Sequence, residues 1–228
     1  MEKTAKKRIP LTKIQKLIGK RMLASKRDKP CFYLQLYADV TEMMAMRPKL
    51  RKDYGIKITT NCFYIRSLAL AAKKYPLMLG RFEDDNIRIP NNINVGFAVN
   101  APQGLVVPVL KKADKKSMPE IAREEKLLTE KARDNKLKFD DISDETIALS
   151  YLGPYGIDSF LAIVPPQTST ILAVGNILHE AVPKNGCPEE RKKVSLTIAA
   201  DHRVIDGAYA AKFLNFLKEQ LQNPKELL

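Results

Sequence analysis

Residues 194–221 read VSLTIAADHRVIDGAYAAKFLNFLKEQL, a strand pattern followed closely by a helix pattern. Val194, Leu196 and Ile198 alternate with polar residues, which predicts a strand with one buried face. Apolar residues then recur at helical spacing and predict an amphipathic terminal helix; they are Ala210, Phe213, Leu214, Leu217 and Leu221. The connection between the two, Asp201–Gly207, lies at the edge of a rigid scaffold, where catalytic side chains are often found.

The rest of the chain mixes helices and strands without a regular alternation. Apolar spacing predicts a helix over residues 12–25, a second that ends at Pro76 and a third behind the capping box Ser117-Met-Pro-Glu120. Alternating residues predict strands at 32–37, 93–99, 146–150 and 169–174. This mixture is typical of an α/β (α+β) fold, in which helices flank a mixed sheet.

Composition and length predict one globular domain. The 228 residues are 45% hydrophobic and 29% charged, and no apolar run approaches the ~20 residues that cross a bilayer. We expect a basic arm at 1–8, a domain at 9–228 and no membrane partner. Cys31, Cys62 and Cys187 are scattered without a CxxC pair, which argues against disulfides and a zinc site. A reducing, cytoplasmic location and no metal are expected.

The net charge of +13 suggests acidic or polyanionic partners without selecting among them. The basic residues form short clusters, which are typical of solvated faces: Lys6-Lys7-Arg8, Lys111-Lys112, Lys115-Lys116 and Arg191-Lys192-Lys193. The sequence contains no zinc-finger pattern and no RNP-like motif. Nucleic-acid binding is therefore the least favoured hypothesis, and no nucleic-acid partner is expected.

The strand-to-helix turn carries the best candidate for acid–base chemistry. The imidazole of His202 can accept a proton near neutral pH. Asp206 could orient this ring or fix the turn, and Gly207 could allow a backbone shape that residues with a Cβ resist. An equally balanced interpretation makes His202 a turn residue and Asp206 the cap of the terminal helix. The other histidine, His179, has no comparable setting and is interpreted as structural.

The sequence holds none of the patterns GxGxxG, GxxxxGK[ST], HExxH or GxSxG. A histidine base without an activated serine or cysteine favours direct transfer between two bound substrates over covalent catalysis.

The segment DHRVIDGAYAAKFL at 201–214 resembles the His-x-x-x-Asp-Gly signature of the dihydrolipoamide acyltransferases, the core components of 2-oxo acid dehydrogenase complexes. Three more segments are similar to the family in the expected order: RIPLTKIQKLIGKRMLASK at 8–26, INVGFAVNAPQGLVVPVLKKADKKSMPEIA at 93–122 and IALSYLGPYGIDSFLAIVPPQTSTILAVG at 147–175. Together they cover nearly the whole chain. The resemblance is strongest to the acetyl-transferring members of pyruvate dehydrogenase complexes.

The resemblance implies a fold like that of chloramphenicol acetyltransferase, assembled as a homotrimer with active sites between subunits. It implies that His202 is the general base that deprotonates a thiol. It also implies that the Ser150 hydroxyl, contributed by a different subunit, stabilises the oxyanion. Asp206 would hold the turn through a basic residue of the opening helix, for which we predict Arg21, with Gly207 in a supporting role.

The implied reaction moves an acyl group, for which we predict acetyl, between dihydrolipoamide and coenzyme A. Coenzyme A and the lipoyl group are then substrates, and no tightly bound cofactor is expected. The segment Ser150–Gly156 is closer to acetyl-transferring than to succinyl-transferring members. The implied partners are acetyl-coenzyme A and a lipoyl domain, from another chain or a missing segment. Homotrimers could also join into a cubic or dodecahedral core.

The chain departs from the family at two positions. Pro30 is followed by Cys31 where members often carry histidine, and a common Leu-Asn pair is replaced by Leu79-Gly80. Two other functions stay open. One is a chloramphenicol-type acetyltransferase that acts on a small hydroxyl acceptor. The other is a non-catalytic assembly scaffold with the same fold.

Overall fold

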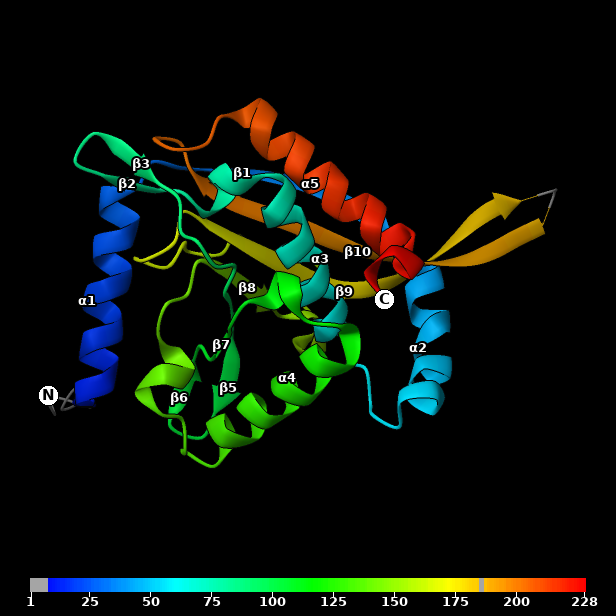
Figure 1. The fold of residues 1–228 in the computed structure, drawn as a ribbon, viewed down its shortest axis with the longest axis horizontal. Helices are drawn as coiled ribbons and strands as arrows, with labels where there is room; N and C mark the ends of the chain where they lie inside the picture. Colours follow the sequence, from blue (N-terminus) through cyan, green and yellow to red (C-terminus); the bar gives the residue numbers. More distant parts are fainter. Residues whose placement is uncertain (1–7, 185–186) are drawn as a thin grey trace, which may run out of the picture.

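The computed structural model describes residues 8–184 and 187–228. The arm predicted at 1–8 lies outside this range except for Arg8. A six-stranded mixed sheet forms the centre of the fold (Figure 1). Its strands in spatial order are β1 (Cys31–Asp39), β10 (Cys187–Asp201), β9 (Thr170–Lys184), β8 (Ile147–Tyr151), β4 (Val95–Phe97) and β7 (Val109–Leu110). The pairs β8–β9 and β4–β8 are parallel and the others antiparallel, so the predicted mixed sheet is confirmed.

Two small hairpins stand beside this sheet. One pairs β2 (Arg81–Glu83) with β3 (Asn86–Arg88), and the other pairs β5 (Val99–Ala101) with β6 (Gly104–Val106). The single strand predicted at 93–99 is therefore wrong, because the chain leaves the main sheet after Phe97. Gly104, with φ of +120°, provides the turn that lets β6 return along β5.

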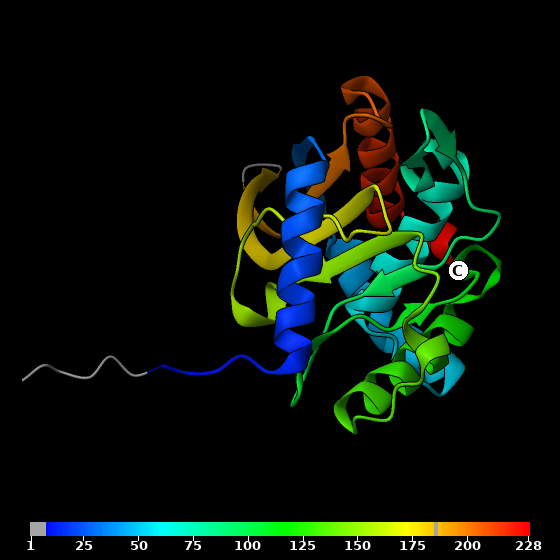
Figure 2. The same ribbon diagram turned by 90° about the vertical axis from the view of Figure 1, so that its left-hand side faces the viewer.

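Helices cover one face of the sheet. They are α2 (Thr41–Tyr54), α3 (Thr60–Lys74), α4 (Met118–Arg133) and α5 (Gly207–Gln222), with short 3₁₀ turns at Pro76–Leu79, Ala113–Lys115, Phe139–Ile142, Gly153–Tyr155 and Pro224–Leu227. The first helix, α1 (Lys13–Asp28), stands apart from this layer at one end of the sheet (Figures 1 and 2). None of the helices in the described ranges is long and apolar enough to cross a membrane.

The main core lies between the sheet and this helical layer. Phe32, Leu34 and Leu36 of β1 face it, as their alternation predicts. The opposite face of the sheet carries a smaller cluster built from Ala148, Val164, Ile171 and Ala199, with Cys31, Tyr33 and Ala162 packed against it. The sheet therefore has a helical face and a second face that no helical layer covers.

The termini of three helices follow the local chemistry. Thr12 and Gln15 form a reciprocal capping box at α1, which runs to Asp28, past the predicted end at 25. At α4 the Glu120 carboxylate accepts the Ser117 N–H at 2.7 Å, as predicted. The N-cap of α5 is Asp206, whose carboxylate accepts the Tyr209 N–H at 2.7 Å.

Two features of the fold are absent from the sequence predictions. Helix α2 was not predicted, because it buries only Met43 and Leu50 and contains Pro48, so its apolar pattern is weak. The last two strands were predicted at about 169–174 and 194–198, but β9 and β10 continue outward as a two-stranded ribbon (Figure 1). The outer part of the ribbon is polar, which explains why apolar alternation did not mark it.

Candidate active site

His202 lies on a turn that backbone hydrogen bonds hold from two sides. Its own N–H donates to the Pro30 carbonyl at 3.0 Å, and the Asp201 N–H donates to the Ser169 carbonyl at 2.9 Å. The Val204 and Ile205 N–H groups both donate to the Asp201 carbonyl. The turn is therefore fixed at the level of the backbone, while the His202 side chain is exposed.

A buried ion pair closes the same turn. The Asp201 side chain is 1% exposed, and its two oxygens accept from Arg203 Nε at 3.0 Å and Nη2 at 2.7 Å. Arg203 also lies over the Phe82 ring of β2, 4.9 Å from its centroid. The hydrogen bonds that Arg203 donates to the Asp201 carboxylate raise the pKa of Arg203. Because the pair is bidentate and the Asp201 carboxylate is buried, it fixes the orientation of the Arg203 guanidinium as well as balancing the charge of Asp201.

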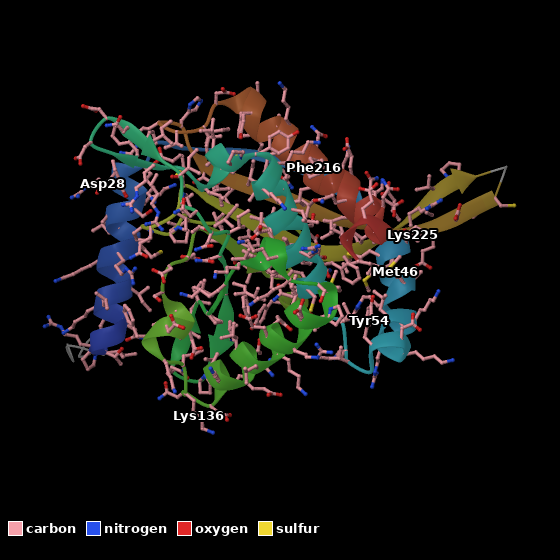
Figure 3. The ribbon with its side chains drawn as sticks, in the orientation of Figure 1. Asp28, Met46, Tyr54, Lys136, Phe216 and Lys225 are labelled. Atoms are coloured by element: carbon pink, nitrogen blue, oxygen red, sulfur yellow. The ribbon has the colours of Figure 1, made fainter. Side chains whose placement is uncertain are left out.

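A second acidic group lies near this ion pair. Asp28 lies at the C-terminal end of α1 (Figure 3). The hydrogen bond from Arg27 is the main cause that lowers the pKa of Asp28, and the charge of Arg203 contributes. The charge of Arg203 therefore acts on Asp28 of α1, while its side chain contacts the hairpin and the turn.

The imidazole of His202 has one ring contact within the described ranges. The ring of Phe32 lies 4.6 Å away, centroid to centroid, at an interplanar angle of 49°. No hydrogen bond to either ring nitrogen is formed within residues 8–184 and 187–228. Both nitrogens are thus free to exchange a proton with a substrate.

Asp206 forms the helix cap that one of its two open interpretations assigned to it, and the predicted contacts with His202 and Arg21 are not formed within the described chain. Asp206 caps α5 and makes no contact with the His202 ring in the described chain. Arg21 is exposed on α1, and no ion pair joins it to Asp206 among the residues described. Gly207 begins α5 outside the left-handed region, and a Cβ there would meet nothing within 4 Å. The proposed backbone reason for Gly207 is therefore wrong for this chain.

Ser150 lies on β8 and on the face of the sheet away from the helices. Its neighbours in β8, Leu149 and Tyr151, pack into the main core, so alternation turns Ser150 to the other face with Ala148. Ser150 is half-buried, and its hydroxyl makes no hydrogen bond to a described residue. The hydroxyl is available to a ligand that reaches this face.

Ser150 and His202 of one chain are far apart. The sheet register aligns Ser150 with Ala173 of β9 and Ala173 with Thr197 of β10. From Thr197, the end of β10 at Asp201 is about 13 Å further along the strand, and two strand spacings add about 10 Å across the sheet. Their backbones are thus about 16 Å apart, too far to contact one reacting carbonyl directly.

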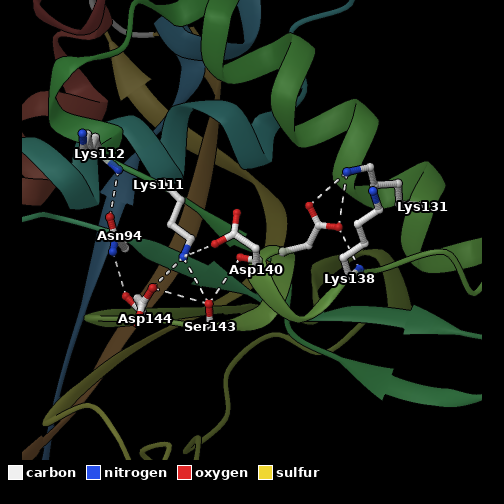
Figure 4. A network of polar contacts seen from close by, with 9 residues as sticks. Asn94, Lys111, Lys112, Lys131, Lys138, Asp140, Ser143 and Asp144 are labelled. Atoms are coloured by element: carbon white, nitrogen blue, oxygen red, sulfur yellow. Dashed lines mark hydrogen bonds and ion pairs between the residues drawn. The ribbon is translucent and has the colours of Figure 1, made fainter.

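The segment that leads into β8 is held by a polar network (Figure 4). Lys111 Nζ lies 2.9 Å from Asp144 Oδ2 and 3.5 Å from Asp140 Oδ1. Asn94 joins both sides, because its Nδ2 donates to the Asp144 carbonyl and its Oδ1 accepts the Lys112 N–H. The network fixes the entry to the strand that carries Ser150.

Two charged residues near the turn could not be identified from the sequence, because neither belongs to a recognisable motif. Lys29 follows α1, and among the described residues its ammonium donates only to backbone carbonyls. Glu145 precedes β8, and its buried Oε1 has no hydrogen-bond partner in the part of the chain that the structure describes. Burial raises the pKa of Glu145 to about 7, against the opposing effect of Arg21, Arg81 and Lys29. Only the folded arrangement brings these groups together.

Cys31 stands where the resembled family often has histidine. It pairs in register with Asp201, and its side chain packs against the small cluster on the second face. Burial is the main cause that raises the pKa of its thiol. The side chain is therefore a neutral thiol at neutral pH. Within the described ranges, no three histidine, cysteine or acidic residues gather as a metal site would require.

The architecture is that of the chloramphenicol acetyltransferase fold. A chloramphenicol acetyltransferase superposes with a TM-score of 0.52 over 89% of this chain and 94% of its own, at 14% identity. This likeness establishes the fold alone, and it confirms the predicted class.

The family follows from the sequence. Residues 3–228 match the model of the 2-oxoacid dehydrogenases acyltransferase family (catalytic domain), and the chain belongs to that family. Component 3 of the dihydrolipoyllysine-residue acetyltransferase of the Arabidopsis thaliana pyruvate dehydrogenase complex is 38% identical over 96% of this chain and 42% of its own length. The corresponding component of Rickettsia bellii is 36% identical over 96% and 53%. The chain thus spans about half the length of these relatives.

Solved structures agree with this assignment. A probable dihydrolipoamide acetyltransferase of Listeria monocytogenes superposes with a TM-score of 0.91 at 32% identity, covering 97% of this chain and 96% of its own. The dihydrolipoamide acetyltransferase of Azotobacter vinelandii gives 0.91 at 29% identity over 97% and 93%. That structure addresses the roles of a serine, a histidine and an asparagine in the catalytic mechanism.

The buried ion pair generates a stability prediction. Arg203→Met leaves the buried Asp201 carboxylate without its partner, so we expect the free energy of unfolding to fall by about 2–4 kcal/mol. Adding Asp201→Asn removes the stranded charge and should recover part of the loss. Urea unfolding of the single and double variants measures both effects.

The control is Arg27→Met, which breaks an exposed pair with Asp28 and should cost less than about 1 kcal/mol. If Arg203→Met is no more damaging than Arg27→Met, the turn does not depend on the buried pair.

Proposed function

We propose that this chain transfers an acetyl group between coenzyme A and the thiol of dihydrolipoamide. The observation that carries the proposal is the exposed, unengaged imidazole of His202 on a turn that backbone hydrogen bonds hold. Family membership supports it, since the relatives are named as acetyltransferases of pyruvate dehydrogenase complexes.

The positions of the polar groups add support. In the Azotobacter vinelandii enzyme the studied serine and histidine are separated by the same number of positions as Ser150 and His202. The studied asparagine follows its histidine by the same interval as Asp206 follows His202. In this chain Asp206 caps α5, so its role in the reaction is to hold the start of the helix behind the histidine.

The reaction requires one base and one oxyanion donor. His202 accepts the proton of the attacking thiol, and the thiolate adds to the thioester carbonyl. The Ser150 hydroxyl donates to the oxyanion of the tetrahedral intermediate. Collapse of the intermediate breaks the original carbon–sulfur bond, and the departing thiolate takes the proton back from His202. A positioned base supplies about 10²–10⁴ in rate, and an oxyanion donor about 10²–10³.

The separation of about 16 Å between the two groups of one chain calls for a second copy. We propose a homotrimer in which His202 of one subunit works with Ser150 of the next. Exposed apolar side chains lie on α1, at Leu17 and Leu23, and on the segment that follows β8, at Tyr155 and Leu161. Burial of these apolar side chains between two copies would stabilise their association. A larger core is proposed by analogy with the cubic pyruvate dehydrogenase core in the solved neighbours.

Coenzyme A and the lipoyl group enter as substrates in this scheme, with no resident cofactor. A lipoyl domain would come from another chain or from a segment outside these residues. The net charge of +13 suits the phosphates of coenzyme A.

The two alternatives have less support. The chloramphenicol acetyltransferase likeness reaches a TM-score of 0.52, against 0.91 for dihydrolipoamide acetyltransferases, and says nothing of a hydroxyl acceptor. A non-catalytic scaffold would not need an unengaged base at the turn and an unengaged hydroxyl on β8.

The first test of the function is acetyl transfer from acetyl-coenzyme A to free dihydrolipoamide. We expect activity in the wild type and a kcat that is roughly 10³-fold lower in His202→Ala, because the thiol loses its base. His179→Ala is the matched control, since His179 pairs with Glu190 on the exposed ribbon, and its rate should be unchanged. An unchanged rate in folded His202→Ala rules out His202 as the base.

The second test concerns the oxyanion. Ser150→Ala should lower kcat by roughly 10²-fold and leave KM for both substrates nearly unchanged, because the hydroxyl acts in the transition state. Steady-state kinetics with each substrate varied in turn separates the two constants. A change confined to KM would show that Ser150 binds substrate and does not stabilise the oxyanion.

A further inference from the structure

Lys29 lies between α1 and β1, and its ammonium donates hydrogen bonds to three backbone carbonyls of a segment that is distant in the sequence. Its Nζ lies 2.6 Å from the Pro165 oxygen, 3.0 Å from the Pro166 oxygen and 2.5 Å from the Thr168 oxygen. A protonated lysine has three N–H donors and no acceptor. Its three donors match the three carbonyls, and Lys29 forms no ion pair with a carboxylate in the described ranges.

The two segments that Lys29 connects flank the His202 turn. The next residue, Pro30, accepts the His202 N–H at 3.0 Å. On the other side, Ser169 follows Thr168 and accepts the Asp201 N–H at 2.9 Å. The lysine thus sets the spacing between the two carbonyls that hold the backbone of the turn.

A second contact ties the same segments together. Ser25 of α1 is 4% exposed, and its hydroxyl donates to the Val164 carbonyl at 2.5 Å. This neutral hydrogen bond anchors α1 to the start of the segment, while the ammonium anchors its end beside the turn. Hydrogen bonds from a charged donor are about twice as strong as neutral ones, so Lys29 contributes the larger restraint.

We propose that Lys29 is a positioning residue for the acyl transfer, because its ammonium holds residues 165–168 against the α1–β1 connection and thereby fixes the approach of the His202 imidazole. The inference rests on the proposed function, in which His202 is the base. Lys29 touches neither the imidazole nor the Ser150 strand, so it acts only through the backbone of the turn.

The charge on Lys29 responds to pH near the working range. Burial lowers its pKa to about 8, and the charged or titratable groups that face it are Asp201, Cys31, Arg203, Arg81 and Glu145. As pH rises through 8 the ammonium loses a proton. A neutral amine keeps two N–H donors for three carbonyls, so at least one contact is lost along with the charge.

The free energy of unfolding does not have the same pH dependence as the Lys29 contacts. The pKa of Lys29 in the folded chain lies below the ordinary lysine value of 10.5, so between the two values the unfolded chain binds more protons. The free energy of unfolding therefore does not fall as Lys29 deprotonates. A loss of activity without a loss of stability distinguishes positioning of His202 from simple support of the fold.

The test is the pH dependence of acetyl transfer in Lys29→Met, which keeps the stem and removes the ammonium. At pH 6.5 we expect kcat to be about tenfold lower with KM unchanged, since small misplacements of a reacting group cost up to about 10²-fold. The ratio of wild-type kcat to variant kcat should then shrink as pH rises through 8, because the wild type loses the same contact.

Two further variants control the result. Lys29→Arg keeps a charge that does not titrate, so it should retain part of the activity and lack the change near pH 8. Lys126→Met is the matched substitution on the exposed face of α4, where the lysine pairs with Glu130 at 3.8 Å. Its kcat should equal that of the wild type at every pH.

If the ratio of wild-type kcat to Lys29→Met kcat stays constant with pH, or if only KM changes, the positioning role is overturned. If the wild type transfers no acetyl group, the proposed function fails separately. Amide hydrogen exchange then tests the clamp. Lys29→Met should speed exchange at Asp201 and His202 while leaving the α4 amides unchanged. Unchanged exchange at the turn overturns the clamp.

Discussion

The carboxylate of Asp201 is buried at the last position of β10, and a buried charge must be paired. Arg203 supplies the partner from two residues further on, so the chain has to fold back at once. His202 is the residue between them, and its side chain is exposed. The Phe82 ring against Arg203 and the backbone bonds to Pro30 and Ser169 then complete the turn. The exposed base is thus a consequence of pairing the buried acid.

The sheet decides what that base can reach. Parallel pairing of β8 with β9 places Ser150 two strand spacings from β10. In the register of the sheet, Ser150 is level with Thr197 and so lies well before the end of β10 at Asp201. Its side chain is on the sheet face that no helical layer covers. A catalytic pair within one chain is thereby excluded at about 16 Å. Exposed apolar side chains also lie on α1 and on the segment after β8. The proposed homotrimer accounts for this separation, because it combines Ser150 of one copy with His202 of another.

Strong periodicity made much of the fold predictable from sequence. The strand and helix around His202, the capping box at Ser117 and the strand that carries Ser150 all follow local patterns. Weak or polar patterns hid α2 and the outer ribbon of β9 and β10. The site was only partly predictable. The turn between strand and helix indicated His202, and only the family resemblance indicated Ser150; the geometry decided between the two open interpretations of Asp206 in favour of the helix cap. Lys29 and Glu145 carry no signal, because their surroundings come from segments more than a hundred residues away or from other elements.

Complementation between two inactive variants tests the central claim most directly. His202→Ala and Ser150→Ala chains with different tags are assembled together, and trimers that contain both tags are purified. Each mixed trimer of cyclic symmetry then has one interface with an intact histidine and an intact serine, so we predict about a third of wild-type acetyl transfer. Each variant alone should stay at its own low rate. Mixed trimers that are no more active than either variant alone would contradict a site shared between subunits.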